Sequence, residues 1–135
     1  MAEIILKTPE ELEIMRKSGR LLASVFDYLD KNITVGTSTM EINDLAERYI
    51  IDQLSARPAS KGQYGYEYSL NTSVNNVVCH GIPSDSQILK SGDIVNVDIT
   101  LEQGGFIADS SKMYTIGEVS PLAKRLVDKT YEAMR

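Results

Sequence analysis

Apolar residues recur at helical spacing in two stretches near the start of the chain. They are Leu12, Met15, Leu22, Val25, Phe26 and Leu29 in the first stretch, and Ile42, Leu45, Tyr49 and Leu54 in the second. Each stretch opens with a capping box, in which a Ser or Thr and the Glu three residues later satisfy each other's backbone N–H groups. The boxes are Thr8 with Glu11 and Ser38 with Glu41. The pattern predicts two core-facing helices, the first ending near Asn32.

The period of the pattern changes to two in the middle of the chain. Strands are predicted at residues 69–78, 94–102 and 106–116. A long loop over residues 55–68 comes before them, and loops of this length are often functional. A third helix is predicted from Ser120, with Leu122, Leu126 and Met134 on one face. The order helix, helix, strands, helix indicates an α+β fold with an antiparallel sheet and helices on one face.

The central predicted strand separates apolar from polar side chains. Val95, Val97, Ile99 and Leu101 alternate with Asn96, Asp98 and Thr100. If residues 103–104 form the turn of a hairpin, Asp98 lies directly across from Asp109. The Cβ atoms of such a pair are about 4.5–5.5 Å apart, where like charges repel each other. Something should therefore compensate the two carboxylates.

A divalent metal ion is the most economical compensation. Two carboxylates from neighbouring strands supply hard oxygen ligands, and the cation removes their repulsion. The spacing also allows two other interpretations: both side chains are solvated on an outer face of the sheet, or a bulge shifts the register by one residue. The residues alone leave these alternatives open.

A second cluster of candidate residues surrounds His80, the only histidine of the chain. Gly81 and Pro83 follow it, so we expect the strand to end here and to present the imidazole at its tip. From there the imidazole can hydrogen-bond a substrate or donate a proton near neutral pH. The alternative is a structural or surface histidine. The neighbouring Cys79 is predicted to be a small buried side chain.

Composition narrows the function further. The 135 residues carry a net charge of −5 and no cluster of Lys or Arg, so nucleic acid is not an expected partner. The N-terminus lacks the pattern of a secretory signal, no apolar stretch is long enough to cross a membrane, and the single Cys fits a reducing compartment. We therefore expect one cytoplasmic domain over residues 1–135. One histidine also excludes a site that needs two imidazoles from one copy.

Three segments in order, 71–83, 90–98 and 105–113, closely resemble type I methionine aminopeptidases. The first contains His80-Gly81-Ile82-Pro83, the second ends at Asp98, and the third contains Asp109. The similarity covers the whole chain, and the order of the motifs is far more specific than any one of them. It implies the N-terminal half of a pita-bread fold, in which two pseudo-symmetric halves hold a dinuclear metal site between them.

The resemblance also implies roles for residues of this chain. Asp98 and Asp109 match the two aspartate metal ligands of the first half, and His80 matches the catalytic histidine beside the metals. Tyr66 and Asn71 fall where the family lines its methionine pocket, so they are the substrate-binding candidates. A divalent metal ion, Co, Mn, Fe or Zn, is implied if the site is completed. The family activity is the removal of N-terminal Met from peptides.

The chain departs from the family pattern in two respects. The other three metal ligands of the family, one His and two Glu, come from the second half and have no counterpart in these 135 residues. In the methionine pocket, Ser60 and Asn71 replace small or thiol side chains, and Gln63 replaces an aromatic one. Such a wall is more polar than a thioether prefers.

Two functions remain compatible with the sequence. The first is one half of a metal-dependent aminopeptidase, inactive as this chain alone and completed by a second copy or by a complementary C-terminal half. The second is a non-catalytic binding or regulatory protein that is derived from the aminopeptidase fold. Both predict a homodimer or another partner, because a half domain exposes a sheet edge and apolar faces.

Overall fold

Two capped helices begin the fold. The computed structural model describes residues 4–135; residues 1–3, part of the N-terminus considered above, lie outside the described residues. α1 spans Pro9–Leu29 and α2 spans Thr39–Arg48, and a π-helical turn at Tyr49–Gln53 follows α2. Both predicted capping boxes are confirmed. α1 ends at Leu29, slightly before the predicted position.

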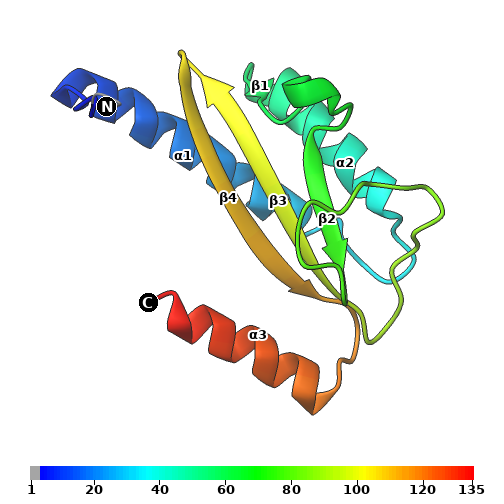
Figure 1. Ribbon diagram of the computed structural model, residues 1–135. Helices are drawn as coiled ribbons and strands as arrows, with labels where there is room; N and C mark the ends of the chain where they lie inside the picture. Colours follow the sequence, from blue (N-terminus) through cyan, green and yellow to red (C-terminus); the bar gives the residue numbers. More distant parts are fainter. Residues whose placement is uncertain (1–3) are drawn as a thin grey trace.

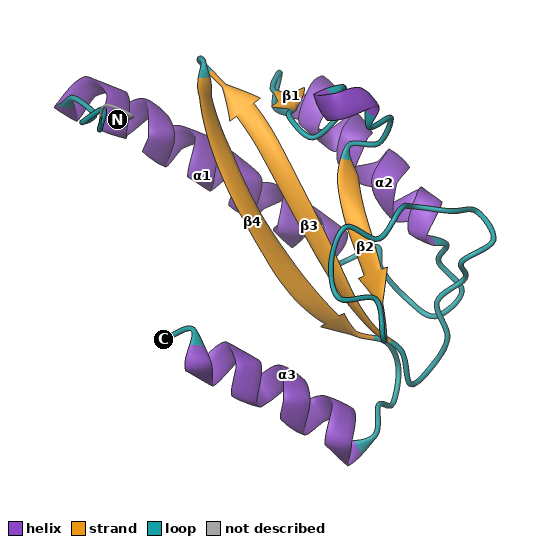
Figure 2. Cartoon of the chain, in the orientation of Figure 1, coloured by secondary structure: helices purple, strands orange, loops and turns teal. Residues whose placement is uncertain are grey.

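The sheet is antiparallel and is built around one central strand. Its strands are β1 at Arg57–Pro58, β2 at Leu70–Val74, β3 at Ile94–Gln103 and β4 at Phe106–Thr115. β3 pairs with β4 along one side and with β2 and the short β1 along the other (Figure 2). The predicted α+β fold is confirmed. The predicted loop over residues 55–68 is only partly irregular, since it contains β1 and a 3₁₀ turn at Gln63–Gly65.

The core lies between the sheet and the first two helices. α1 and α2 lie behind the sheet in Figure 1, and their apolar side chains pack on one face of β3. The cluster includes Leu22, Val25, Phe26 and Leu29 from α1, Ile42 and Ala46 from α2, and Val95, Val97, Ile99 and Leu101 from β3. Because side chains alternate along a strand, the opposite face of β3 carries Asn96, Asp98 and Thr100, as predicted. We call this polar side of the sheet the open face.

The turn of the β3–β4 hairpin differs from the prediction. Its two residues are Gly104 and Gly105, with φ of 62° and 81°, rather than Gln103 and Gly104. A tight turn of this kind needs positive φ at both central positions, which glycine adopts without strain. The register therefore moves by two residues, and Asp98 does not lie directly opposite Asp109.

β2 is shorter than predicted. It ends at Val74, and Asn75 then turns the backbone with φ of 52° while its side chain donates to Asp93 and accepts from the backbone N–H of residue 94. The residues that follow form an exposed loop. Cys79 lies in this loop and is exposed, so the prediction that it is buried is wrong. His80 lies in the same loop and not at a strand end.

α3 spans Pro121–Ala133, and its N-cap is Ser120, the residue from which the helix was predicted. None of the side chains of α3 is buried. Its predicted apolar face is exposed, with Leu122 at 77% and Met134 at 73% of full accessibility. In Figure 1, α3 lies outside the layer that α1 and α2 form. Among the described residues, no helix combines the length and apolar composition of a membrane span.

Candidate functional site

Asp98 and Asp109 project from neighbouring strands to the open face. In the observed register Asp98 lies across from Ser111, and Asp109 lies across from Thr100. The two aspartates are therefore diagonal neighbours, at a Cβ separation of roughly 7 Å. A shift by two residues keeps both side chains on one face. The structure thus brings the two carboxylates together, though less closely than the predicted register.

The surroundings raise the pKa of Asp98. Its partial burial is the largest cause, and the negative charge of Asp109 and a hydrogen bond with that carboxyl raise the pKa further. The charge of His80 acts in the opposite direction. Thr100 Oγ1 donates to Asp109 Oδ1 at 3.2 Å. A pair of carboxyls held this close offers several oxygen ligands to a cation, which would relieve their repulsion.

His80 reaches the same neighbourhood from the loop after β2. Thr72 N–H donates to Gly81 O at 2.8 Å, and Gly81 N–H donates to Ser73 Oγ at 3.1 Å, so the loop is fastened to β2. A Cβ on Gly81 would lie 2.0 Å from Thr72 O, and only glycine permits this close approach. His80 is exposed, has φ of 54°, and lies within electrostatic range of Asp98.

Tyr66 and Asn71 also lie close to Asp98. Asn71 on β2 is directly across from Asp98, so the two side chains share the open face. The Tyr66 hydroxyl donates to Leu70 O at 2.9 Å, and its ring meets the Tyr68 ring edge to face. Burial, followed by the charges of Tyr68 and Asp98, raises the pKa of Tyr66 to about 12. The other four candidate residues thus gather around Asp98, and the roles of all five stay predictions.

Two supporting side chains were not among the sequence candidates. Ser73 holds the His80 loop, and Thr100 holds the Asp109 carboxyl. A register based on a turn at residues 104–105 would have placed Thr100 opposite Asp109. Nothing in the sequence pointed to Ser73, because its partner comes from an irregular loop.

The two aspartates are of a side-chain type that suits a divalent metal ion, but they are only two. Asp98 and Asp109 offer the hard carboxylate oxygens that such ions prefer. Within residues 4–135, however, no group of three or more His, Cys, Asp and Glu side chains is arranged so that it could hold a metal ion.

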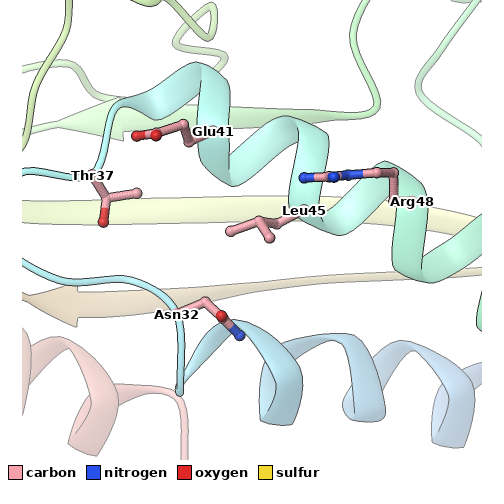
Figure 3. Close-up of a pocket in the computed structure, with 5 residues that line it drawn as sticks. All are labelled: Asn32, Thr37, Glu41, Leu45 and Arg48. Atoms are coloured by element: carbon pink, nitrogen blue, oxygen red, sulfur yellow. The ribbon is translucent and has the colours of Figure 1, made fainter.

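A separate pocket of about 190 Å³ lies among the helices. Asn32, Thr37, Glu41, Leu45 and Arg48 line it (Figure 3). These residues come from α2 and from the segment that joins α1 to α2, and none of them is a site candidate. The pocket is therefore not part of the candidate site.

Comparisons with known proteins identify the family. The sequence pattern of metallopeptidase family M24 matches residues 13–135. The methionine aminopeptidase of Escherichia coli (strain K12) is 42% identical over 131 residues, which cover 97% of this chain and 50% of that protein. The crystal structure of methionine aminopeptidase from Rickettsia prowazekii superposes with a TM-score of 0.94 at 39% identity, covering 98% of this chain and 52% of that one.

More distant structures share the fold alone. The Xaa-Pro dipeptidase from Bacillus anthracis, at 21% identity, superposes with a TM-score of 0.73 and covers 89% of this chain and 32% of its own. The similarities together confirm the resemblance to methionine aminopeptidases and the half of a pita-bread fold. The chain spans about half the length of the methionine aminopeptidases that it matches. It belongs to metallopeptidase family M24.

Proposed function

We propose that this chain provides one half of a divalent-metal centre of the methionine aminopeptidase type, with Asp98 and Asp109 as ligands. The observation that carries the proposal is the pair of carboxyls on the open face, where burial and Asp109 raise the pKa of Asp98. A bound cation reverses this effect, because it stabilises the ionised form of both groups. Co, Mn, Fe or Zn is the proposed ion, and a peptide N-terminus is the proposed substrate.

Each of the other candidates has a part in this proposal. A divalent ion, when bound, polarises a carbonyl oxygen and lowers the pKa of water. His80, exposed beside Asp98, donates a hydrogen bond or a proton to the peptide near the bond that is cleaved. Tyr66 and Asn71 form the wall that contacts the N-terminal residue of the substrate.

The proposed centre needs ligands from outside these 135 residues. The chain has one histidine, and the described residues hold no set of three suitable ligands. A complementary C-terminal half or a second copy is the proposed source. We expect the chain alone to bind metal weakly and to show no peptidase activity.

A non-catalytic function is the second candidate, and the polar wall favours it. Gln63 donates from its amide to Ala59 O at 2.6 Å in the loop that carries Tyr66, and Asn71 lies across from Asp98. Amide side chains here suit a thioether poorly. In this alternative the chain binds a partner and cleaves nothing.

Metal titration tests the first proposal. Calorimetry with Mn²⁺ should show binding to the wild-type chain that Asp98→Asn and Asp109→Asn each abolish. The control, Asp85→Asn, changes an exposed carboxyl farther along the connection between β2 and β3 and should bind like the wild type. Absence of binding to the wild-type chain, or unchanged binding in both site variants, would refute the proposal.

Hydrolysis of a Met-Ala-Ser peptide separates the two candidate functions. The chain is co-expressed with the C-terminal half of the Escherichia coli relative, and Co, Mn or Fe is added. Turnover that disappears in Asp98→Ala would establish the aminopeptidase function. Metal binding without turnover in the assembled pair would favour the non-catalytic function.

A further inference from the structure

A second set of polar contacts fastens the segment that carries Tyr66 to α2. We call residues 61–69 the Tyr66 segment. Asn43 and Glu47 lie one helical turn apart and so share a face of α2. Asn43 Oδ1 accepts the Ser69 backbone N–H at 2.9 Å, and Glu47 Oε2 accepts the Ser69 hydroxyl at 2.5 Å. The C-terminal end of the segment is thus held twice.

Glu47 also holds the other end of the Tyr66 segment. Its second oxygen, Oε1, lies 2.6 Å from Lys61 Nζ. The Glu47 side chain is 23% exposed, so the pair is less screened by water than a fully exposed ion pair. The contacts with Lys61 and Ser69 lower the pKa of Glu47, against the effect of its burial. One carboxylate therefore joins both ends of the segment.

The backbone between these two ends is irregular. Gly62, Tyr64 and Gly65 all have positive φ, and Tyr64 is fully exposed. Positive φ is uncommon and strained for an aromatic residue. The backbone hydrogen bonds here are local, with Gly62 N–H donating to Tyr66 O at 2.7 Å. The segment is therefore a compact unit whose placement depends on what its ends contact.

We propose that Glu47 is a positioning residue of the candidate site: by holding Lys61 and Ser69, it sets where the Tyr66 ring lies relative to Asp98. The inference rests on the proposed function, in which Tyr66 contacts the substrate. Glu47 acts only through the segment. Its side chain bonds to Lys61 and Ser69, whereas the Tyr66 hydroxyl bonds to Leu70 O beside the open face.

Nuclear magnetic resonance of the metal-free chain with ¹³C-labelled tyrosine rings tests this role. In the wild type the Tyr66 and Tyr68 ring centroids are 5.5 Å apart and should give cross peaks. Glu47→Ala should shift the Tyr66 ring signals and weaken those cross peaks. Glu47→Gln keeps an acceptor for the Ser69 hydroxyl and should restore most of the wild-type spectrum. Lys61→Met should cause a smaller shift in the same direction.

A matched control separates positioning from the general loss of an ion pair. Glu132→Ala removes the exposed pair with Lys129 on α3 and should leave the Tyr66 signals unchanged. The proposal is overturned if Glu47→Ala moves the Tyr66 signals no more than Glu132→Ala does. If Glu47→Ala does not fold, Lys61→Met decides, and unchanged Tyr66 signals in that variant overturn the proposal.

The experiment is independent of the metal titration. Because no metal or substrate is present, failure of Mn²⁺ to bind at Asp98 would leave the tyrosine result as it is. Likewise, unchanged Tyr66 signals in Glu47→Ala would leave the result of the Mn²⁺ titration as it is. The two proposals therefore fail separately.

Discussion

Among the single residues of the site, Asp98 is placed where its charged form is disfavoured. Burial and the charge of Asp109 both raise its pKa. A side chain that works against the stability of the free chain at neutral pH is typical of binding and catalytic sites. The physical argument for a role of Asp98 in binding thus comes from its surroundings and is independent of the family resemblance.

Asp98→Asn should raise the melting temperature of the metal-free chain at neutral pH. The folded pKa of Asp98 lies above the unfolded value, so ionisation costs stability above that pKa, and the cost disappears as the pH falls below about 3.9. Thermal unfolding in EDTA should therefore show the gain at pH 7 and little difference at about pH 3.5. A lower melting temperature for the variant at pH 7 would contradict the argument.

Gly81→Ala should destabilise the chain and displace His80. The new Cβ would lie 2.0 Å from Thr72 O, which is backbone and cannot yield easily. We expect a loss of about 2 kcal/mol in urea unfolding and a shift of the His80 imidazole signals. Gly19→Ala is the control: no atom lies within 4 Å of its Cβ in α1, so a gain of about 0.5–1 kcal/mol is expected. Equal effects of the two variants would rule out the proposed contact.

At the scale of elements, features that depend on residues close in the sequence were predicted correctly. Features that depend on contacts between distant residues were not. The helix caps at Thr8 and Ser38 depend on residues three positions apart, and both were predicted. The end of β2 depends on a contact between Asn75 and Asp93, which the sequence does not show. The hairpin register depends on a choice between adjacent turns, and Gly105 with its positive φ decided it.

One buried hydroxyl adds a polar contact between α1 and the turn of the β3–β4 hairpin to the apolar packing. Ser18 Oγ lies 3.2 Å from the carbonyl oxygens of Gln103 and Phe106, on either side of the turn. Ser18→Ala should lower the free energy of unfolding by about 1–2 kcal/mol, because a buried acceptor loses its donor. The control is Ser24→Ala, whose hydroxyl bonds only within α1, and we expect a smaller loss. A loss from Ser18→Ala no greater than the control would contradict this contribution of the polar contact.

At the scale of the whole molecule, two apolar surfaces remain without a partner in the described residues. β4 pairs with β3 on one side and with no described strand on the other. A groove of about 400 Å³ runs between β4 and α1. Its lining is mainly apolar, from Met15, Leu22, Ala23, Phe26, Ile107 and Ala108, and it also includes Gly19, Asp109 and Ser110. α3 adds the exposed side chains of Leu122 and Leu126. Unpaired strand edges and exposed apolar faces of this kind favour association.

We therefore predict that the chain associates at micromolar concentration and that Leu122→Asp with Leu126→Asp weakens the association. Sedimentation velocity measures both, and Lys124→Ala with Lys129→Ala on the same helix is the control. The effect of salt distinguishes apolar from electrostatic association. Each copy carries a net charge of −5, so salt screens the repulsion between copies and should strengthen an apolar contact between them. A stable monomer, or association that salt weakens, would mean that the apolar surfaces of α3 and β4 do not drive self-association.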